Sequence, residues 1–196
     1  LSKKPEIQWV KNLDASENWS VQYTSKSPVQ SGSNDNYYMF LNTTAARGDT
    51  SEYFTATTGK SPQGSGSNGQ SIIVYTWHSV PGYSRIGTFM GNGSSSGPFV
   101  YCGFRPAWVL WKRSNGTENW VIVNNKMSPI NPVDLFLRAD ETTTESSSAA
   151  TCDFVSDGFT IRTSDTKSNA NGDYYLFMAE AEQPLSTPYG SQANAR

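Results

Sequence analysis

The sequence predicts an all-β protein, and three observations support this prediction. Only 16% of the 196 residues are charged, against about 25% in ordinary soluble domains, so Ser, Thr, Asn and Gly supply most of the polarity. Short runs rich in Val, Ile, Thr, Tyr and Trp alternate with clusters of Gly and Asn, which is typical of strands separated by turns. Windows rich in Ala, Leu, Glu and Lys, which favour helices, are absent.

The strand assignments depend on run length and composition, because a short apolar run has no period that separates a strand from a buried helix. The clearest segment is an Asp-Gly turn at residues 157–158 followed by alternation of Phe159, Ile161 and Thr163 with polar residues. Residues 91–97 predict a flexible hairpin loop, and residues 114–120 and 168–175 predict hairpin connections. The predicted strands cover residues 37–42, 54–58, 71–77, 84–90, 99–104, 107–112, 119–124, 159–163 and 173–179.

An internal repeat is visible in the triplet Glu-Asn-Trp, which occurs at residues 17–19 and again at 118–120. Four further segments match in the same order, with Pro5 and Lys11 aligned to Pro106 and Lys112 at the same offset of 101. The other matched pairs are 37–42 with 133–138, 54–58 with 159–163, and 68–77 with 171–180. This order indicates a duplicated module of strands, so we predict tandem antiparallel β-sandwich modules or one composite sandwich built from both copies.

The repeat divides the chain into a first module at residues 1–82 and a second at residues 83–196. The opening strands of the second module, between residues 79 and 106, have no counterpart before Pro5. We expect those of the first module either upstream in a longer protein or from a neighbouring chain, because an open sheet edge invites aggregation. The last twelve residues predict a tail.

Charge and hydropathy argue against two classes of partner. The net charge of −2 and the pI of about 5.4 offer no basic surface for nucleic acid. No apolar run approaches the roughly 18 residues that span a bilayer, so we expect no membrane insertion. Cys102 and Cys152 are either paired or two buried thiols, and the sequence leaves this open.

The sequence predicts no catalytic residue, no metal site and no cofactor. Its single histidine, His78, leaves little room for a catalytic triad or a histidine-rich metal centre. Glycoside hydrolysis needs two facing carboxylates, yet most acidic residues fall in turns or at strand ends without the pattern of such a pair. The glycine-rich residues 91–97 lack the lysine of a phosphate-binding loop.

Aromatic side chains are the main candidates for either a core or a binding surface. Trp19 and Trp120 occupy matching positions in the repeat and precede apolar residues, which predicts an inward role for both. We predict the same core role for Trp108, Phe159 and Phe177. Trp77, Tyr83 and Tyr37 fall near predicted strand ends and are the candidate surface contacts.

Four motifs resemble an uncharacterised β-sandwich module of tailed-bacteriophage virion proteins. These motifs are Gly-Phe-Arg-Pro at residues 103–106, the paired-strand segment 112–120, Ser-Asp-Gly-Phe at 156–159 and the aromatic strand at 174–178. The resemblance covers the second module fully and the first from Pro5 onward. The first module has Ser-Glu-Tyr-Phe at 51–54 in place of Ser-Asp-Gly-Phe.

The resemblance implies a concanavalin-like or jelly-roll sandwich in a tail fibre, tail spike or other virion appendage. It implies a non-enzymatic structural or adhesive role, contacts with other virion chains, a homo-oligomer such as a trimer, and a host surface glycan as ligand. The protein would be assembled in the bacterial cytoplasm and act in the extracellular particle. The first alternative is a carbohydrate-binding, lectin-like module, and the second, less favoured by the sequence, is a glycan hydrolase.

Overall fold

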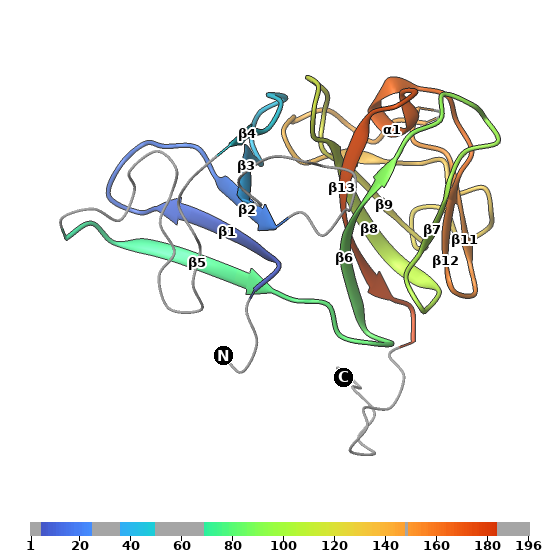
Figure 1. Cartoon of the computed structure of the whole chain (residues 1–196), viewed down its shortest axis with the longest axis horizontal. Helices are drawn as coiled ribbons and strands as arrows, with labels where there is room; N and C mark the ends of the chain where they lie inside the picture. The colour runs from blue at the N-terminus through green and yellow to red at the C-terminus, as the bar shows by residue number, and fades with distance from the viewer. Residues whose placement is uncertain (1–4, 25–35, 50–68, 148, 184–196) are drawn as a thin grey trace, which may run out of the picture.

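The structure is a computed structural model that describes residues 5–24, 36–49, 69–147 and 149–183. In these residues the strands form three antiparallel sheets, which confirms the all-β prediction (Figure 1). The elements, in chain order, are β1 (Ile7–Asn12), β2 (Ser20–Thr24), β3 (Asn36–Phe40), β4 (Gly48–Asp49), β5 (Ile72–Trp77), β6 (Ser84–Met90), β7 (Phe99–Tyr101), β8 (Pro106–Arg113), β9 (Val121–Asn124), β10 (Leu137–Arg138), β11 (Cys152–Val155), β12 (Gly158–Ile161), α1 (Thr166–Asn169) and β13 (Tyr174–Ala181).

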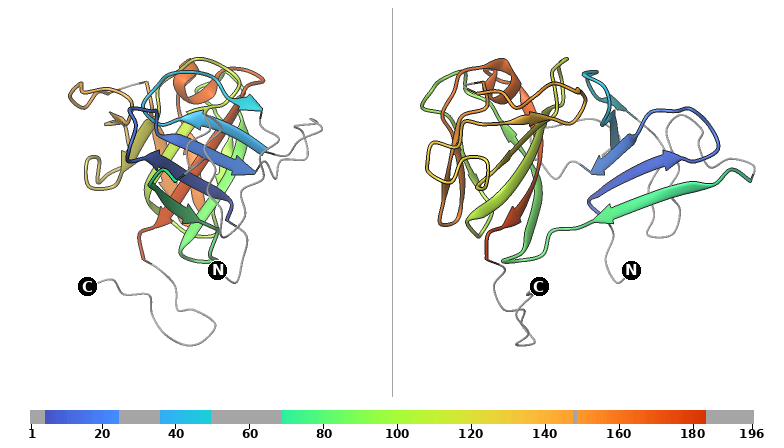
Figure 2. Two further views of the ribbon diagram at one scale, coloured as in Figure 1. Left: turned by 90° about the vertical axis from the view of Figure 1, so that its left-hand side faces the viewer. Right: turned by 180° about the vertical axis from the view of Figure 1, so that it is seen from behind.

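The first half of the chain forms one sheet and the second half forms two. The first sheet has the strand order β4-β3-β2-β1-β5, the second has β10-β9-β8-β13-β6, and the third has β11-β12-β7. Figures 1 and 2 show the second sheet in the middle, with the first sheet on one side of it and the third on the other. The middle sheet therefore packs against a partner on both of its faces.

Side-chain alternation along the middle sheet divides its residues between two cores. On β8, Val109 and Trp111 belong to a core shared with the third sheet, whereas Leu110 between them belongs to a core shared with the first. On β13, Phe177 and Met178 divide in the same way. Successive side chains of a strand point to opposite faces, so a sheet buried on both faces needs the nearly continuous apolar runs seen in β8 and β13.

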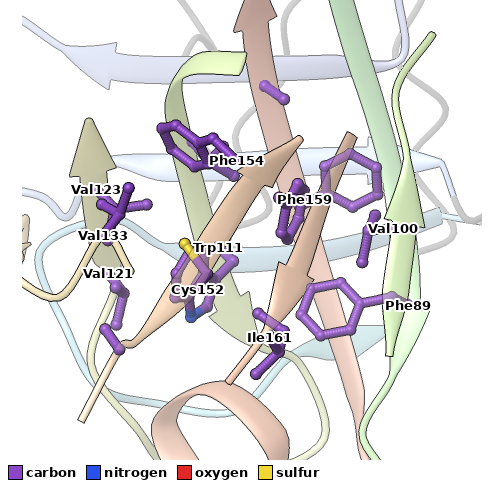
Figure 3. Close-up of a cluster of buried hydrophobic side chains, with 14 of the residues drawn as sticks. Phe89, Val100, Trp111, Val121, Val123, Val133, Cys152, Phe154, Phe159 and Ile161 are labelled. Atoms are coloured by element: carbon purple, nitrogen blue, oxygen red, sulfur yellow. The ribbon is translucent and has the colours of Figure 1, made fainter. Parts of the chain in front are cut away.

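The core between the second and third sheets is the larger one (Figure 3). Trp111 and Phe159 stack with ring centroids 6.1 Å apart, and Phe89 packs on Tyr175 at 5.0 Å. Cys152 lies in this core, and both it and Cys102 are buried and free, as the buried-thiol interpretation expected.

The core between the first and second sheets joins the two halves of the chain. Its buried members are Ile7, Val21, Tyr23, Tyr37, Met39, Ile86, Leu110, Trp120, Leu176 and Met178. Half of these come from the first sheet and half from the second, so the first sheet covers its inward face by packing on the second.

Most strand predictions are confirmed, with shifts of one to three residues at their ends. Residues 84–90 form β6 as predicted, and the predicted runs at 71–77, 107–112 and 173–179 correspond to β5, β8 and β13. Helix α1 was not predicted, because one turn of helix has no periodic pattern; its start is fixed by Asp165, whose side chain accepts a hydrogen bond from Lys167 N. The predicted strand at 54–58, the segment at 51–54 and the C-terminal tail lie outside the described residues.

The loop at residues 91–97 is anchored, which corrects the prediction of a flexible connection. The Asn169 amide nitrogen donates hydrogen bonds to Asn92 Oδ1, Ser94 O and Thr163 O at 2.7–3.0 Å. At Gly91 an added Cβ would lie 2.2 Å from Ala170 O, so the loop packs directly on the end of α1. Glycine is required there by a close approach of two backbones.

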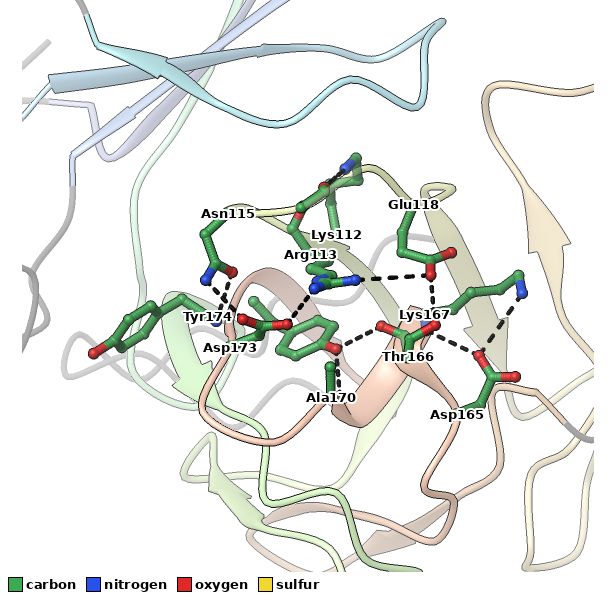
Figure 4. A network of polar contacts seen from close by, with 12 residues as sticks. Lys112, Arg113, Asn115, Glu118, Asp165, Thr166, Lys167, Ala170, Asp173 and Tyr174 are labelled. Carbon is green, nitrogen blue, oxygen red and sulfur yellow. Dashed lines mark hydrogen bonds and ion pairs between the residues drawn. The ribbon is translucent and has the colours of Figure 1, made fainter.

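A polar network holds α1 against the β8–β9 hairpin (Figure 4). The guanidinium of Arg113 contacts Asp173 Oδ2 at 2.5 Å and Glu118 Oε1 at 4.0 Å. Thr166, in the helix, donates from Oγ1 to the same Glu118 oxygen at 2.5 Å. Glu118, the first residue of the second Glu-Asn-Trp triplet, therefore links the β8–β9 hairpin to α1.

The two Lys…Glu-Asn-Trp segments each span a hairpin connection, one between β1 and β2 and the other between β8 and β9. Lys11 on β1 donates from Nζ to Glu17 O at 2.5 Å, across the β1–β2 connection. Lys112 on β8 donates from Nζ to Arg113 O at 2.7 Å and Gly116 O at 3.3 Å, within the β8–β9 connection. In both hairpins the lysine supplies a hydrogen-bond donor to backbone carbonyls at or after the end of its strand.

The backbone N–H of each tryptophan in the two triplets donates a hydrogen bond to an Asn or Asp side chain. Asn42 Oδ1 accepts from Trp19 N at 2.9 Å, and Asp140 Oδ1 accepts from Trp120 N at 3.0 Å. These contacts match Asn42 to Asp140, two positions beyond the sequence alignment, which matched residue 42 to residue 138.

Candidate functional site: an aromatic platform beside a polar hollow

Four aromatic side chains form a row across one face of the first sheet, which we call the aromatic platform: Trp9, Trp19, Tyr75 and Trp77. The register places Trp9 on β1 opposite Tyr75 on β5, and Ile7 opposite Trp77. Residues directly opposite in an antiparallel pair point to the same face, as do residues two apart on one strand. Trp19 precedes β2 by one residue and completes the row.

The rings of the platform contact one another in sequence. The Trp9 and Trp77 centroids are 4.8 Å apart, those of Trp77 and Tyr75 are 6.1 Å apart, and those of Tyr75 and Trp19 are 6.5 Å apart. The last two pairs are nearly parallel, with interplanar angles of 22° and 27°. Such contacts hold the rings in fixed orientations, which lowers the entropic cost of binding a ligand against them.

One end of the platform is fixed by the core and the other is open to solvent. Trp9 and Trp77 pack against the core between the first and second sheets, whereas the Tyr75 side chain is 44% exposed. Trp19 is half-buried. The platform thus offers apolar ring surface on a rigid base.

A polar hollow adjoins the Trp19 end of the platform. It has a volume of about 450 Å³ and is lined by Ser16, Glu17, Asn18 and Asn42. The Asn42 amide nitrogen donates to Asn18 Oδ1 at 2.9 Å, so both amides are held in place. Fixed amides next to an apolar surface are the usual composition of a small-molecule site.

Asn42 also lines a second hollow of about 450 Å³ with residues 139–143. The Asn119 amide nitrogen donates to Asp140 Oδ2 at 2.9 Å and to Glu141 Oε1 at 2.8 Å. Because Asn42 lines both hollows, the two hollows adjoin each other. The polar surface beside Trp19 therefore continues to Asp140 and Glu141.

The three predicted surface contacts lie in three different settings. Trp77 is part of the platform. Tyr83 is 42% exposed but lies in the turn before β6, outside the platform. Tyr37 is 2% exposed in the core between the first and second sheets, so it is not available as a surface contact. Its position near a strand end did not determine its burial, because the second sheet covers that part of β3.

The five predicted core residues are also not equivalent. Trp120 and Phe159 are fully buried and Phe177 is 3% exposed. Trp108 is partly buried against the core between the first and second sheets. Trp19 stacks on Tyr75 and is half-buried, so the structure places it at the margin of the surface. The two tryptophans of the repeated triplet differ because only Trp120 points into the space between the sheets, where its Nε1 donates to Phe40 O at 2.8 Å.

Two platform residues, Trp9 and Tyr75, were not singled out from the sequence. The available signal was the spacing of Tyr75 and Trp77, which are two apart and therefore share a face of a strand. The pairing of β1 with β5 joins residues that are 66 positions apart in the case of Trp9 and Tyr75, and no local pattern indicates it.

Burial shifts the pKa of several ionisable groups, and Lys112 is the most informative. Its fully buried position lowers the pKa from 10.5 to about 8, while the negative charges of Asp140 and Glu118 oppose this shift. Burial raises the pKa of the Cys102 thiol to about 12 and that of Cys152 further, so both thiols stay protonated.

Within the described residues, no group of three or more His, Cys, Asp or Glu side chains is placed to hold a metal ion. In the same part of the chain, no helix has the length and apolar composition needed to cross a membrane.

Comparison with known proteins identifies one family. Residues 1–184 match the family model described as Domain of unknown function (DUF7483). No curated protein and no solved structure matches the chain. Because the match covers almost the whole sequence, the chain belongs to the DUF7483 family.

Proposed function

We propose that this protein is a non-catalytic adhesive module that binds a glycan on its aromatic platform. The observation that carries the proposal is the row of three partly buried rings and one exposed ring, ordered by ring contacts and adjoining a hollow lined by fixed amides.

The chemistry of the platform fits a sugar ring better than other small ligands. A pyranose has an apolar face of C–H groups that packs on an indole or phenol ring, and a rim of hydroxyls that needs both donors and acceptors. The Asn18 and Asn42 amides and the Glu17 carboxylate supply donors and acceptors beside Trp19. The contacting rings extend over several residues, which suits an oligosaccharide.

We further propose a virion appendage as the setting, on the basis of the sequence motifs that resemble phage virion modules. In this setting the partners are other virion chains, the protein forms a homo-oligomer such as a trimer, and the glycan belongs to the host surface. Sedimentation velocity of the purified protein tests the oligomer, and a monomer at all concentrations would contradict it.

The two five-stranded sheets support an origin by duplication. The orders β3-β2-β1-β5 and β10-β9-β8-β13 place the repeated segments at corresponding positions. The Lys11 and Lys112 contacts, and the Asn42 and Asp140 caps, repeat with them. We propose a duplicated unit in which the second copy, with the third sheet, forms a sandwich of the concanavalin-like or jelly-roll type.

Glycan-array binding tests the function with a matched pair of tyrosines. The Tyr75→Ala protein should lose at least about tenfold in affinity for any glycan that the wild type retains, because the exposed ring of the platform is removed. Tyr83→Ala removes a tyrosine of similar exposure outside the platform and should bind as the wild type does.

Two results would contradict the proposal. Equal binding by the Tyr75→Ala and wild-type proteins would show that the platform is not the site. Release of reducing sugar from the bound polysaccharide would show that the protein is an enzyme. Circular dichroism of each variant separates loss of binding from loss of folding.

A further inference from the structure

Strand β5 forms a free margin of the first sheet, because in the described residues it pairs only with β1 (Figure 1). The other marginal strands of the described sheets are short or bridged. β4 and β10 have two residues each and β7 has three. β6 and β11 are joined to neighbouring segments by the bridges Val80–Ser84 and Val133–Cys152. β5 has six residues and takes part in no such bridge within the described part of the chain.

The backbone of β5 offers hydrogen-bonding groups along this margin. Leu13 N donates to Ser71 O at 2.9 Å, and the bonds of an antiparallel pair recur at every second residue. The register with β1 has no shift, so the odd-numbered residues of β5 are the ones bonded to β1. The N–H and C=O groups of Ile72, Val74 and Thr76 therefore point outward. No described residue bonds to these outward groups.

The sequence of β5 does not protect this margin. Sheets usually blunt an exposed marginal strand with a charged residue, a proline or a bulge. β5 reads Ile-Ile-Val-Tyr-Thr-Trp, which includes no charge and no proline, and its register with β1 has no bulge. In the correspondence of the two sheets proposed above, β13 takes the place of β5 and has β6 on its other side. A strand added to β5 would extend the first sheet in the same way.

A second copy of β5 complements this margin. With a twofold axis at Val74, this residue lies opposite the partner's Val74, and Ile72 lies opposite the partner's Thr76. All of these residues carry outward backbone groups, so each pair can exchange hydrogen bonds. Ile73 lies opposite the partner's Tyr75, which pairs a β-branched side chain with an aromatic one. The pairing brings no like charges together, because β5 has no charged residue.

We propose that β5 binds β5 of a second copy of this chain, so that two first sheets join into one antiparallel sheet. Both copies use the same residues, as a twofold interface requires. Ile73 and Tyr75 share the platform face, so the dimer sets two aromatic platforms on one face of the joined sheet. The contact depends on the backbone and side chains of β5, and it does not depend on what the platform binds.

Two charge variants test the interface, because Val74 faces itself across the axis. By sedimentation velocity, the wild type should form a dimer whose fraction rises with protein concentration. Val74→Lys and Val74→Glu should each associate at least about tenfold more weakly, since like charges meet. Mixing the two variants should restore the dimer, because opposite charges then meet. Leu137→Lys places the same charge on the short marginal strand β10 and should associate as the wild type does.

Amide hydrogen exchange tests the same contact without a substitution. In the wild type, exchange in β5 should slow as the protein concentration rises, because the outward N–H groups of Ile72, Val74 and Thr76 become bonded. Exchange in β3, which lies between β2 and β4, should not change with concentration.

Four results would overturn the proposal. They are a wild-type monomer at all concentrations, association that Val74→Lys leaves unchanged, exchange in β5 that is independent of concentration, and a trimer that both Val74 variants leave intact. Circular dichroism checks that each variant is folded. Val74→Lys keeps all four rings of the platform, so glycan binding by this variant tests the proposed function separately from the dimer.

Discussion

At the scale of single residues, Asn169 joins three segments of the chain through one buried amide. Its nitrogen has three acceptors and its Oδ1 accepts from Asn92 N at 2.8 Å. Asn169→Ala removes these bonds and leaves partly buried groups without partners, so we expect a loss of about 2–4 kcal/mol in the free energy of unfolding. Urea denaturation measures it, with the exposed Asn171→Ala as control.

One result of the urea experiment would contradict this prediction. If Asn169→Ala and Asn171→Ala unfold at the same urea concentration, the 91–97 loop does not depend on these bonds. Faster amide hydrogen exchange in that loop should accompany the loss of stability, since the anchor is removed.

Lys112 gives a pH prediction at the residue scale. The folded state holds its pKa at about 8, below the ordinary value of 10.5, so the unfolded state binds more protons between these values. Burying the charged form costs stability at neutral pH, and this cost disappears as pH rises from about 8 to 10.5. Because Lys112→Met has no such group, the stability of the wild type relative to Lys112→Met should rise by up to about 3 kcal/mol over this window.

Denaturant unfolding of both proteins at pH 7 and pH 10 measures this difference. Comparing the two proteins at each pH removes the contribution of tyrosines and other lysines that titrate in the same range. A difference that stays constant would show that the ammonium group of Lys112 is solvated in the folded protein.

At the scale of the elements, the two Glu-Asn-Trp hairpins share contacts but differ in what they pack against. Trp120 is fully buried and donates to Phe40 O, which links β3 of the first sheet to the β9 region of the second. Trp120→Ala should therefore cost roughly 3–5 kcal/mol of unfolding free energy. Trp19→Ala should cost about 1 kcal/mol, because Trp19 is half-buried.

Thermal or urea unfolding of the two tryptophan variants checks this ranking. Equal losses would mean that Trp19 is as deeply packed as Trp120, in line with the interpretation from sequence alone. The glycan assay adds an independent measure, because only Trp19 lies in the platform and only its variant should weaken binding.

At the scale of the whole molecule, the core between the first and second sheets makes the two halves interdependent. Leu110, 2% exposed, lies in this core, and Leu110→Ala should cost about 2–4 kcal/mol. The variant should still unfold in one transition, with circular dichroism and tryptophan fluorescence changing together. Leu137→Ala, at a 38% exposed position on β10, is the control and should change stability by less than about 0.5 kcal/mol.

Two separate transitions in the wild type would contradict this view of the molecule. They would indicate that the first sheet and the pair formed by the second and third sheets unfold independently. The division at residues 82 and 83 falls between β5 and β6 in the structure, but the domain assignment itself stays a prediction.

The sequence was sufficient for the features that depend on neighbouring residues. Strand composition and turn residues located β5, β6, β8 and β13, because β-branched and aromatic runs bounded by Gly and Asn have few other stable conformations. Each copy of the Glu-Asn-Trp triplet follows a strand whose lysine, Lys11 or Lys112, bonds to a backbone carbonyl within a few residues along the chain, and the duplication itself stays a prediction.

The tertiary structure alone decided which of these side chains are covered. Alternation shows that two residues share a face of a strand, but it does not show what packs on that face. Tyr37 became core and Tyr75 became surface because the second sheet covers β3 and leaves part of β5 open. That coverage comes from a core that joins distant parts of the chain, with Met39 of the first sheet and Met178 of the second among its members. The candidate glycan site is the part of the same face that this core leaves exposed.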